Sequence, residues 1–247
     1  MNYTKFNELV DDINSIVTQK VEIVNHARGR HVGIKFVDKP VPISINESEY
    51  NFMHHTIVNN NLKVGYELST GVGISTISIS KAFKYTDGHL ISLDSYYEEI
   101  THVSNNIPIG NYTYKDKQKV AEISNSYNML KQYFSNKNLS KFVDLEIGWS
   151  PTDSIKLLEK RNMLLDFVFL DCPKSDEEFE RDLNSIVPFL GKRYVIFVHD
   201  THTFTKKSFE LVYDVLKLKM EKIYNYFENT DHSSVRHFPL GIINNLN

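Results

Sequence analysis

The chain has 247 residues, 41% of them hydrophobic and 24% charged, a composition that suits one large α/β domain with added elements and excludes a disordered or fibrous chain. Its formal net charge of −3 argues against a nucleic-acid partner, because proteins that bind phosphate backbones carry a basic excess. Its single cysteine, Cys172, forms no internal disulfide, and its apolar stretches fall short of the roughly 20 residues of a membrane span, so we expect a cytoplasmic protein with no membrane partner.

Residues 1–62 are predicted to form a helical cap. Apolar residues recur at helical spacing between residues 3 and 26, and a second helix is predicted over residues 47–61. Between these helices, residues 29–42 contain glycines and prolines that predict an irregular connector with room for one short strand. The cap would precede a larger domain formed by the rest of the chain.

Residues 63–247 are predicted to form this larger, Rossmann-like domain. Two late runs, residues 222–229 and 236–245, predict a closing antiparallel pair. Earlier apolar runs are typical of buried parallel strands and alternate with helical patterns: residues 63–69, 89–94, 142–148, 164–171 and 193–200. The pattern predicts an α/β fold with a mostly parallel, seven-stranded sheet, helices on both faces and an antiparallel final strand.

One segment interrupts this alternation. Residues 103–136 are polar and rich in Asn, Lys and Tyr, which predicts an insertion made of a loop and a helix over residues 116–134. The aromatic residues in it predict a lid or a subunit contact near the ligand site: Tyr112, Tyr114, Tyr127, Tyr133 and Phe134. Self-association into a homo-oligomer therefore stays open.

A glycine turn follows the first strand of the larger domain. Glu67 lies at the strand end, and Gly71 and Gly73 lead into residues 74–83, which we interpret as a helix although they alternate with period 2. Small residues let the backbone approach a ligand, and the free N–H groups of a helix N-terminus favour an anion. Asp94 ends the next strand, where a carboxylate can accept two hydrogen bonds from a ribose diol. Together the two segments indicate a nucleotide-type ligand at the carboxyl edge of the sheet.

These segments resemble the class I S-adenosylmethionine-dependent methyltransferases, and more narrowly the small-molecule O-methyltransferases of the catechol O-methyltransferase type. The family's first motif, acid-x-Gly-x-Gly-x-Gly, stands here as E-L-S-T-G-V-G, with Ser69 in the first glycine place. The resemblance implies that S-adenosylmethionine is bound by Glu67, Ser69, Gly71, Gly73, Ser75 and Asp94. Trp149 and Ser150 follow the third strand, where the family holds the adenine. Trp149 either stacks on the adenine or is a core aromatic residue.

The next two strand ends resemble a metal site of the same enzymes. The fourth strand ends in FLDCPKS, and the resemblance implies that Asp171 binds Mg²⁺ or Mn²⁺ and that Lys174 is the general base. The fifth strand ends in VHDTH, similar to the His-Asp pair of the macrolide-sugar and cephalosporin-cluster methyltransferases, which implies Asp200 as second ligand. Either His199 or His202 completes the ligand set or acts as base. Since neighbouring residues on a strand point in opposite directions, His199 and Asp200 both face the ion only if the strand has ended.

From these features we expect an enzyme that transfers a methyl group from S-adenosylmethionine to an oxygen of a small-molecule acceptor, assisted by a divalent metal. Two alternatives stay open. One is a metal-independent small-molecule methyltransferase with His199 as base. The other is a catalytically inactive methyltransferase-like binding module, which Ser69 in a glycine place and Trp149 beside the adenine position would suit.

Overall fold

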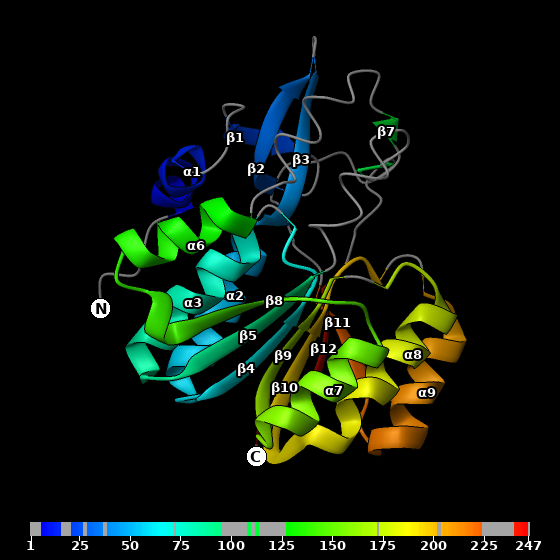
Figure 1. Cartoon of the computed structure of the whole chain (residues 1–247). Coiled ribbons are helices and arrows are strands. Elements are labelled where there is room, and N and C mark those ends of the chain that lie inside the picture. Colours follow the sequence, from blue (N-terminus) through cyan, green and yellow to red (C-terminus); the bar gives the residue numbers. More distant parts are fainter. Residues whose placement is uncertain are drawn as a thin grey trace.

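The computed structural model describes residues 6–15, 21–26, 29–36, 39–71, 73–94, 108–109, 112–113, 127–171, 173–201, 204–223 and 240–246. A large central sheet carries helices on both faces, and a small antiparallel sheet lies beyond the carboxyl ends of its parallel strands (Figure 1). None of the helices in these ranges is long and apolar enough to cross a membrane.

The central sheet confirms the predicted fold class. It has seven strands in the order β11-β12-β10-β9-β4-β5-β8. The five strands β10, β9, β4, β5 and β8 are parallel, and β12 runs antiparallel to both β10 and β11. The strand bounds are β4 Val64–Leu68, β5 His89–Asp94, β8 Val143–Ile147, β9 Leu165–Leu170, β10 Leu190–Val198, β11 Met220–Ile223 and β12 Leu240–Asn245.

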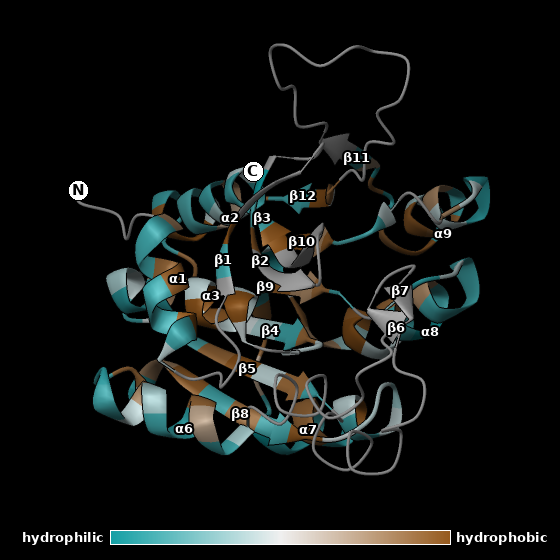
Figure 2. Ribbon diagram, turned by 90° about the horizontal axis from the view of Figure 1, so that it is seen from above, coloured by the Kyte–Doolittle hydropathy of each residue, from teal (hydrophilic) through white to brown (hydrophobic). Residues whose placement is uncertain are grey.

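Helices cover the two faces of this sheet as two groups (Figures 1 and 2). One face carries α1 Phe6–Asn14, α2 Glu47–Asn59, α3 Ile74–Thr86 and α6 Tyr127–Asn136. The other face carries α7 Thr152–Arg161, α8 Asp176–Ile186 and α9 Lys206–Leu216. Two short 3-10 helices, Ser140–Phe142 and Val187–Phe189, precede β8 and β10.

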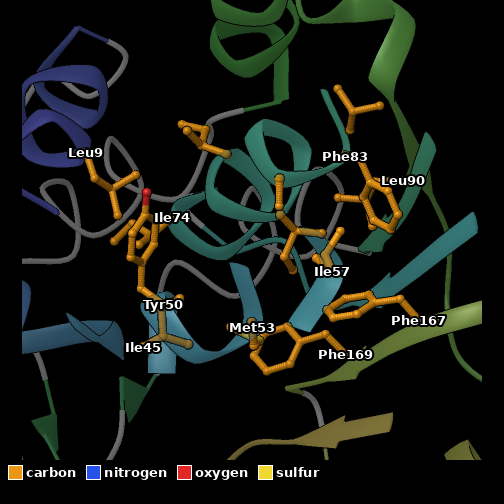
Figure 3. Packing of buried hydrophobic residues seen from close by; sticks show 14 of the residues in the cluster. Leu9, Ile45, Tyr50, Met53, Ile57, Ile74, Phe83, Leu90, Phe167 and Phe169 are labelled. Carbon is orange, nitrogen blue, oxygen red and sulfur yellow. The ribbon is translucent and has the colours of Figure 1, made fainter. Parts of the chain in front are cut away.

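Alternation along the strands divides the core into two apolar clusters. Phe167 and Phe169 of β9 point into the cluster under α1, α2, α3 and α6, whereas Val168 and Leu170 point into the cluster under α7, α8 and α9. In Figure 3, Met53 of α2 lies beside Phe169. Apolar residues on both faces of one strand explain the continuous run that predicted it.

The N-terminal region differs from the predicted helical cap. Helix α1 ends at Asn14, and the chain then forms a three-stranded antiparallel sheet: β1 Val21–His26, β2 Gly29–Phe36 and β3 Lys39–Asn46. The expected helix to residue 26 and the expected irregular connector are therefore wrong. Pro40 and Pro42 are tolerated because β3 is an edge strand, where a missing N–H breaks no ladder. The division into a cap and a larger domain at residue 62 stays a prediction.

The predicted insertion also needs correction. Helix α6 lies between β5 and β8 in the chain and buries Leu130, Tyr133 and Phe134 in the core, so residues 127–136 are part of the fold itself. A two-stranded hairpin, β6 Pro108–Ile109 and β7 Tyr112–Thr113, precedes it. The earlier part of the helix predicted over residues 116–134 and most of the predicted lid lie outside the described residues.

Candidate active site

The strand order creates a ligand position at the carboxyl ends of β4 and β9. From β4 the chain proceeds outward to β5 and β8 and then returns to β9 and β10 on the other side, so the connections diverge at this point. Backbone hydrogen bonds continue past the strand ends, from Ser69 N to Leu93 O at 2.9 Å and from Asp171 N to Leu68 O at 3.1 Å. The candidate residues that follow the strands are thereby fixed along one edge.

The glycine turn after β4 is held by Asp94. Three of the residues that the structure describes in this turn have positive φ: Ser69 at 84°, Gly71 at 51° and Gly73 at 87°. This conformation favours glycine, and Ser69 adopts it in the place where the family motif has a glycine. The N–H of Gly71 donates to Asp94 Oδ2 at 2.8 Å. The carboxylate of Asp94, which we expect to bind a ribose, therefore also fixes the conformation of the glycine turn.

Glu67 lies beneath this turn in the core. Its side chain is fully buried, and its Oε2 accepts hydrogen bonds from Thr76 Oγ1 and Ser92 Oγ, both at 2.6 Å. Burial raises the pKa of Glu67 to about 7, although hydrogen bonds from hydroxyl groups oppose this shift. Ser75 is buried as well. Both side chains are therefore part of the core next to the turn. Their expected contacts with a cofactor stay predictions.

Acidic, basic and imidazole groups meet after β9 and β10. Strand β10 ends at Val198, and Asp200 has a φ of 57°, so the chain turns and both His199 and Asp200 face Asp171. Nδ1 of His199 lies 2.8 Å from Asp171 Oδ1 and 3.6 Å from Asp200 Oδ1. One ligand atom from each of these three residues lies within 4.8 Å of the others. Strand β10 therefore ends before His199, which is the condition under which His199 and Asp200 can face the same ion.

Lys174 completes this group. Its Nζ donates to Asp200 Oδ2 at 2.8 Å and to the backbone oxygen of Asp171 at 3.0 Å, and its side chain is 52% exposed. The ammonium group compensates the charge of Asp200, while the imidazole of His199 does so for Asp171. We therefore call Asp171, Lys174, His199 and Asp200 the strand-end cluster.

Glu49, at the start of α2, reaches the same cluster and was missed in the sequence analysis. Its Oε2 lies 3.5 Å from Nε2 of His199. Burial of His199 would lower its pKa, but the carboxylates of Asp171, Asp200 and Glu49 together hold this pKa well above its ordinary value. The signal available in the sequence was the spacing Asn46-x-x-Glu49, which is typical of a helix capping box.

Trp149 and Ser150 lie at the turn after β8. Trp149 is 49% exposed, so the interpretation as a core aromatic residue is wrong. Ser150 Oγ donates to Asp182 Oδ1 of α8 at 2.5 Å, and the turn is tied to β5 by a hydrogen bond from Gly148 N to Asp94 O at 3.0 Å. Contacts of Trp149 and Ser150 with an adenine stay predictions. Cys172 and His202 lie outside the described residues.

The fold and the turn at its switch point define a methyltransferase-like domain. A family model described as a methyltransferase domain matches residues 67–201. The chain belongs to this family of methyltransferases, which confirms the resemblance to the class I S-adenosylmethionine-dependent enzymes. No curated protein matches the sequence.

Solved structures show the same fold at low sequence identity. An O-methyltransferase from Bacillus cereus in complex with SAH has 11% identity and a TM-score of 0.52, over 82% of this chain and 83% of that chain. The O-methyltransferase TomG from Streptomyces achromogenes, involved in tomaymycin synthesis and in complex with SAM, has 11% identity and a TM-score of 0.51, over 82% of this chain and 81% of that chain. At this identity the similarity concerns the fold alone.

Proposed function

We propose that this protein transfers a methyl group from S-adenosylmethionine to an oxygen of a small-molecule acceptor. The observation that carries the proposal is the position of the glycine turn and Asp94 at the switch point of the sheet, beside the strand-end cluster. The two similar structures, named as O-methyltransferases with SAH and SAM, support the choice of donor and of oxygen as the methylated atom.

Residues of the glycine turn would hold the donor. When bound, S-adenosylmethionine supplies a methyl group activated by a sulfonium. Asp94 would accept from the ribose hydroxyl groups, and Gly71, whose Cβ position has no described heavy atom within 4 Å, would allow the backbone to approach. The first N–H groups of α3 would face the carboxylate of the methionine part. The exposed ring of Trp149 would stack on the adenine.

The chemistry of the strand-end cluster fits a divalent ion. Asp171 and Asp200 offer carboxylate oxygens, which Mg²⁺ and Mn²⁺ bind readily, and their like charges favour a cation between them. When bound, such an ion supplies Lewis acidity that lowers the pKa of an acceptor hydroxyl group. Asp171 and Asp200 would hold it.

Lys174 is the proposed general base. Its half-exposed Nζ lies at the edge of the sheet, within reach of a molecule that approaches from solvent, and would take the proton of the acceptor hydroxyl. In the structure this group donates to Asp200, so it must first release its own proton. Proton transfer and methyl transfer then require the acceptor oxygen to lie in line with the methyl group.

A metal-independent enzyme with His199 as base is the second candidate. It is favoured by the internal charge balance of the cluster, because Lys174 pairs with Asp200 and His199 with Asp171 without an added cation. An inactive binding module stays a third reading, although Ser69 adopts the left-handed conformation that the motif needs in the place of a glycine.

Two assays separate these readings. Calorimetric titration with SAH tests for a donor site, and a screen of hydroxylated small molecules with S-adenosylmethionine tests for turnover, with Mg²⁺ or with EDTA. SAH binding with turnover lost in EDTA supports the proposal. Full turnover in EDTA would show that the protein is a metal-independent methyltransferase. SAH binding without turnover of any acceptor would favour an inactive binding module. Absence of SAH binding contradicts the proposal itself.

A further inference from the structure

Glu49 connects the N-terminal region to the strand-end cluster, although the family match begins only at residue 67. It lies in the first turn of α2 with 3% of its surface exposed. A carboxylate this deeply buried needs polar partners. Its Oε2 has two groups nearby, the N–H of Asn46 at 2.8 Å and Nε2 of His199 at 3.5 Å. The first contact belongs to the helix cap, whereas the second has no role in forming the helix.

The two nitrogens of His199 face different groups. Nδ1 points to Asp171 and Asp200, at 2.8 and 3.6 Å, and Nε2 points to Glu49. The ring has little freedom, since only 13% of the side chain is exposed and it packs edge to face against Phe169 with 6.3 Å between ring centroids. Histidines that bind metal ions show this division: one nitrogen binds the ion, and the other N–H is donated to a carboxylate that fixes the ring and its tautomer.

Glu49 itself is fixed by its own helix. Its backbone N–H donates to Asn46 Oδ1 at 2.9 Å, and its carboxylate accepts from Asn46 N, which forms a reciprocal capping box. The carboxylate is therefore held in place before any ion is present. Such preorganisation is what a group needs if it is to orient a ligand rather than follow it.

We propose that Glu49 is a positioning residue that holds His199 with Nδ1 toward Asp171 and Asp200, so that an ion at this site is bound by one imidazole nitrogen and two carboxylates. The inference rests on the proposed function and adds the third ligand and the class of metal. Imidazole suits transition metals, whereas Mg²⁺ prefers oxygen ligands and retains its waters. The site therefore prefers Mn²⁺ and Co²⁺ to Mg²⁺, with Co²⁺ bound more tightly than Mn²⁺.

Pulsed EPR of the full chain loaded with Mn²⁺ tests the nitrogen ligand without any activity assay. We expect the hyperfine coupling of a directly bound imidazole nitrogen in the wild type, its loss in His199→Gln, and its retention in the matched control His202→Gln. Mn²⁺ bound without nitrogen coupling, or coupling that persists in His199→Gln, overturns the proposal. So does displacement of Mn²⁺ by an equal concentration of Mg²⁺.

Metal titration of two variants tests the role of Glu49. Glu49→Gln keeps an oxygen for Asn46 N but removes the charge that faces His199, and we expect Mn²⁺ affinity to fall about 10–100-fold. Asn46→Ala removes the side-chain half of the capping box but keeps the backbone N–H of residue 46 that holds the Glu49 carboxylate, so we expect lower thermal stability with unchanged Mn²⁺ affinity. Equal losses of affinity in the two variants would reduce Glu49 to a structural role and overturn the proposal. If Glu49→Gln does not fold, the wild-type EPR result still decides the ligand set.

SAH titration in EDTA keeps this inference distinct from the proposed function. SAH binding together with a failed Mn²⁺ experiment overturns the inference and leaves the methyl-donor site intact. A nitrogen-coupled Mn²⁺ site without SAH binding supports the ligand set and contradicts the proposed function.

Discussion

Replacement of Gly73 by alanine tests how the glycine turn packs on α6. A Cβ at this position would lie 2.4 Å from Cδ2 and 2.8 Å from Cδ1 of Leu130, and the residue has a φ of 87°. The left-handed conformation costs an L-residue roughly 1–2 kcal/mol, and overpacking a buried site costs roughly 1–3 kcal/mol. Since Leu130 is fully buried, its methyl groups have little room to move. We expect Gly73→Ala to lower the free energy of unfolding by about 2–5 kcal/mol, the sum of these two costs.

Gly71→Ala is the matched control for this variant. Gly71 has a φ of 51°, but no heavy atom of the described residues lies within 4 Å of a Cβ built on it, so only the conformational cost of roughly 1–2 kcal/mol applies. Urea unfolding followed by circular dichroism gives both values. In a Leu130→Ala background the cost of Gly73→Ala should fall to that of Gly71→Ala. Equal destabilisation by the two single variants, or no coupling to Leu130, would refute the argument.

The other predictions concern charged groups of the site. Because the pKa of Glu67 is raised to about 7 from an ordinary value of 4.5, its contribution to stability is present below that ordinary value and is lost as the pH rises through about 7. Glu67→Gln should therefore reduce the fall in Tm between about pH 5 and pH 8, and parallel falls in both proteins would contradict this. Asp94→Ala should weaken SAH binding by about 1–3 kcal/mol in calorimetry, whereas unchanged affinity would show that Asp94 is not at the ribose. Lys174→Met should lower turnover about 100-fold or more, leave SAH affinity unchanged and tighten Mn²⁺ binding, because Nζ no longer shares Asp200; unchanged turnover would remove Lys174 as base.

The central sheet was predictable because its parallel strands are buried on both faces. Phe167 to Leu170 are all apolar, and such a run ends where a polar residue, here Asp171, meets solvent. The small N-terminal sheet was not predictable in this way, since its strands mix polar residues, glycines and prolines and depend on pairing with one another. Strand signals are weak where the neighbouring strand, rather than the core, determines the conformation.

Helix α6 was predicted as a helix but was assigned to an insertion rather than to the core, for a related reason. Its polar residues alternate with apolar ones, and Leu130, Tyr133 and Phe134 are buried in the core at the spacing of one helix face, with Met129 packed against the same cluster. Average composition hides such a stripe, whereas the periodicity reveals it. The core contact of Leu130 with the position of Gly73 shows that this helix supports the turn.

The candidate site was predictable to the extent that it lies at strand ends. Asp94, Asp171 and Asp200 each end or follow a parallel strand, and parallel strands bring such residues to one edge. Glu49 belongs to a helix far away in the sequence, and its position beside His199 results from the packing of α2 on the sheet. The spacing Asn46-x-x-Glu49 predicts the helix cap that Glu49 forms, but it gives no information about the contact of Glu49 with His199.

A crystal structure of the protein with SAH would test the central claim most directly, namely that the methyl donor lies against the glycine turn at the switch point. We predict that the ribose hydroxyl groups lie within hydrogen-bond distance of Asp94, with the homocysteine part along residues 69–75 and the sulfur directed toward the strand-end cluster. SAH bound elsewhere, or an Asp94 carboxylate that still bonds to Gly71 N and makes no contact with the ligand, would contradict the account.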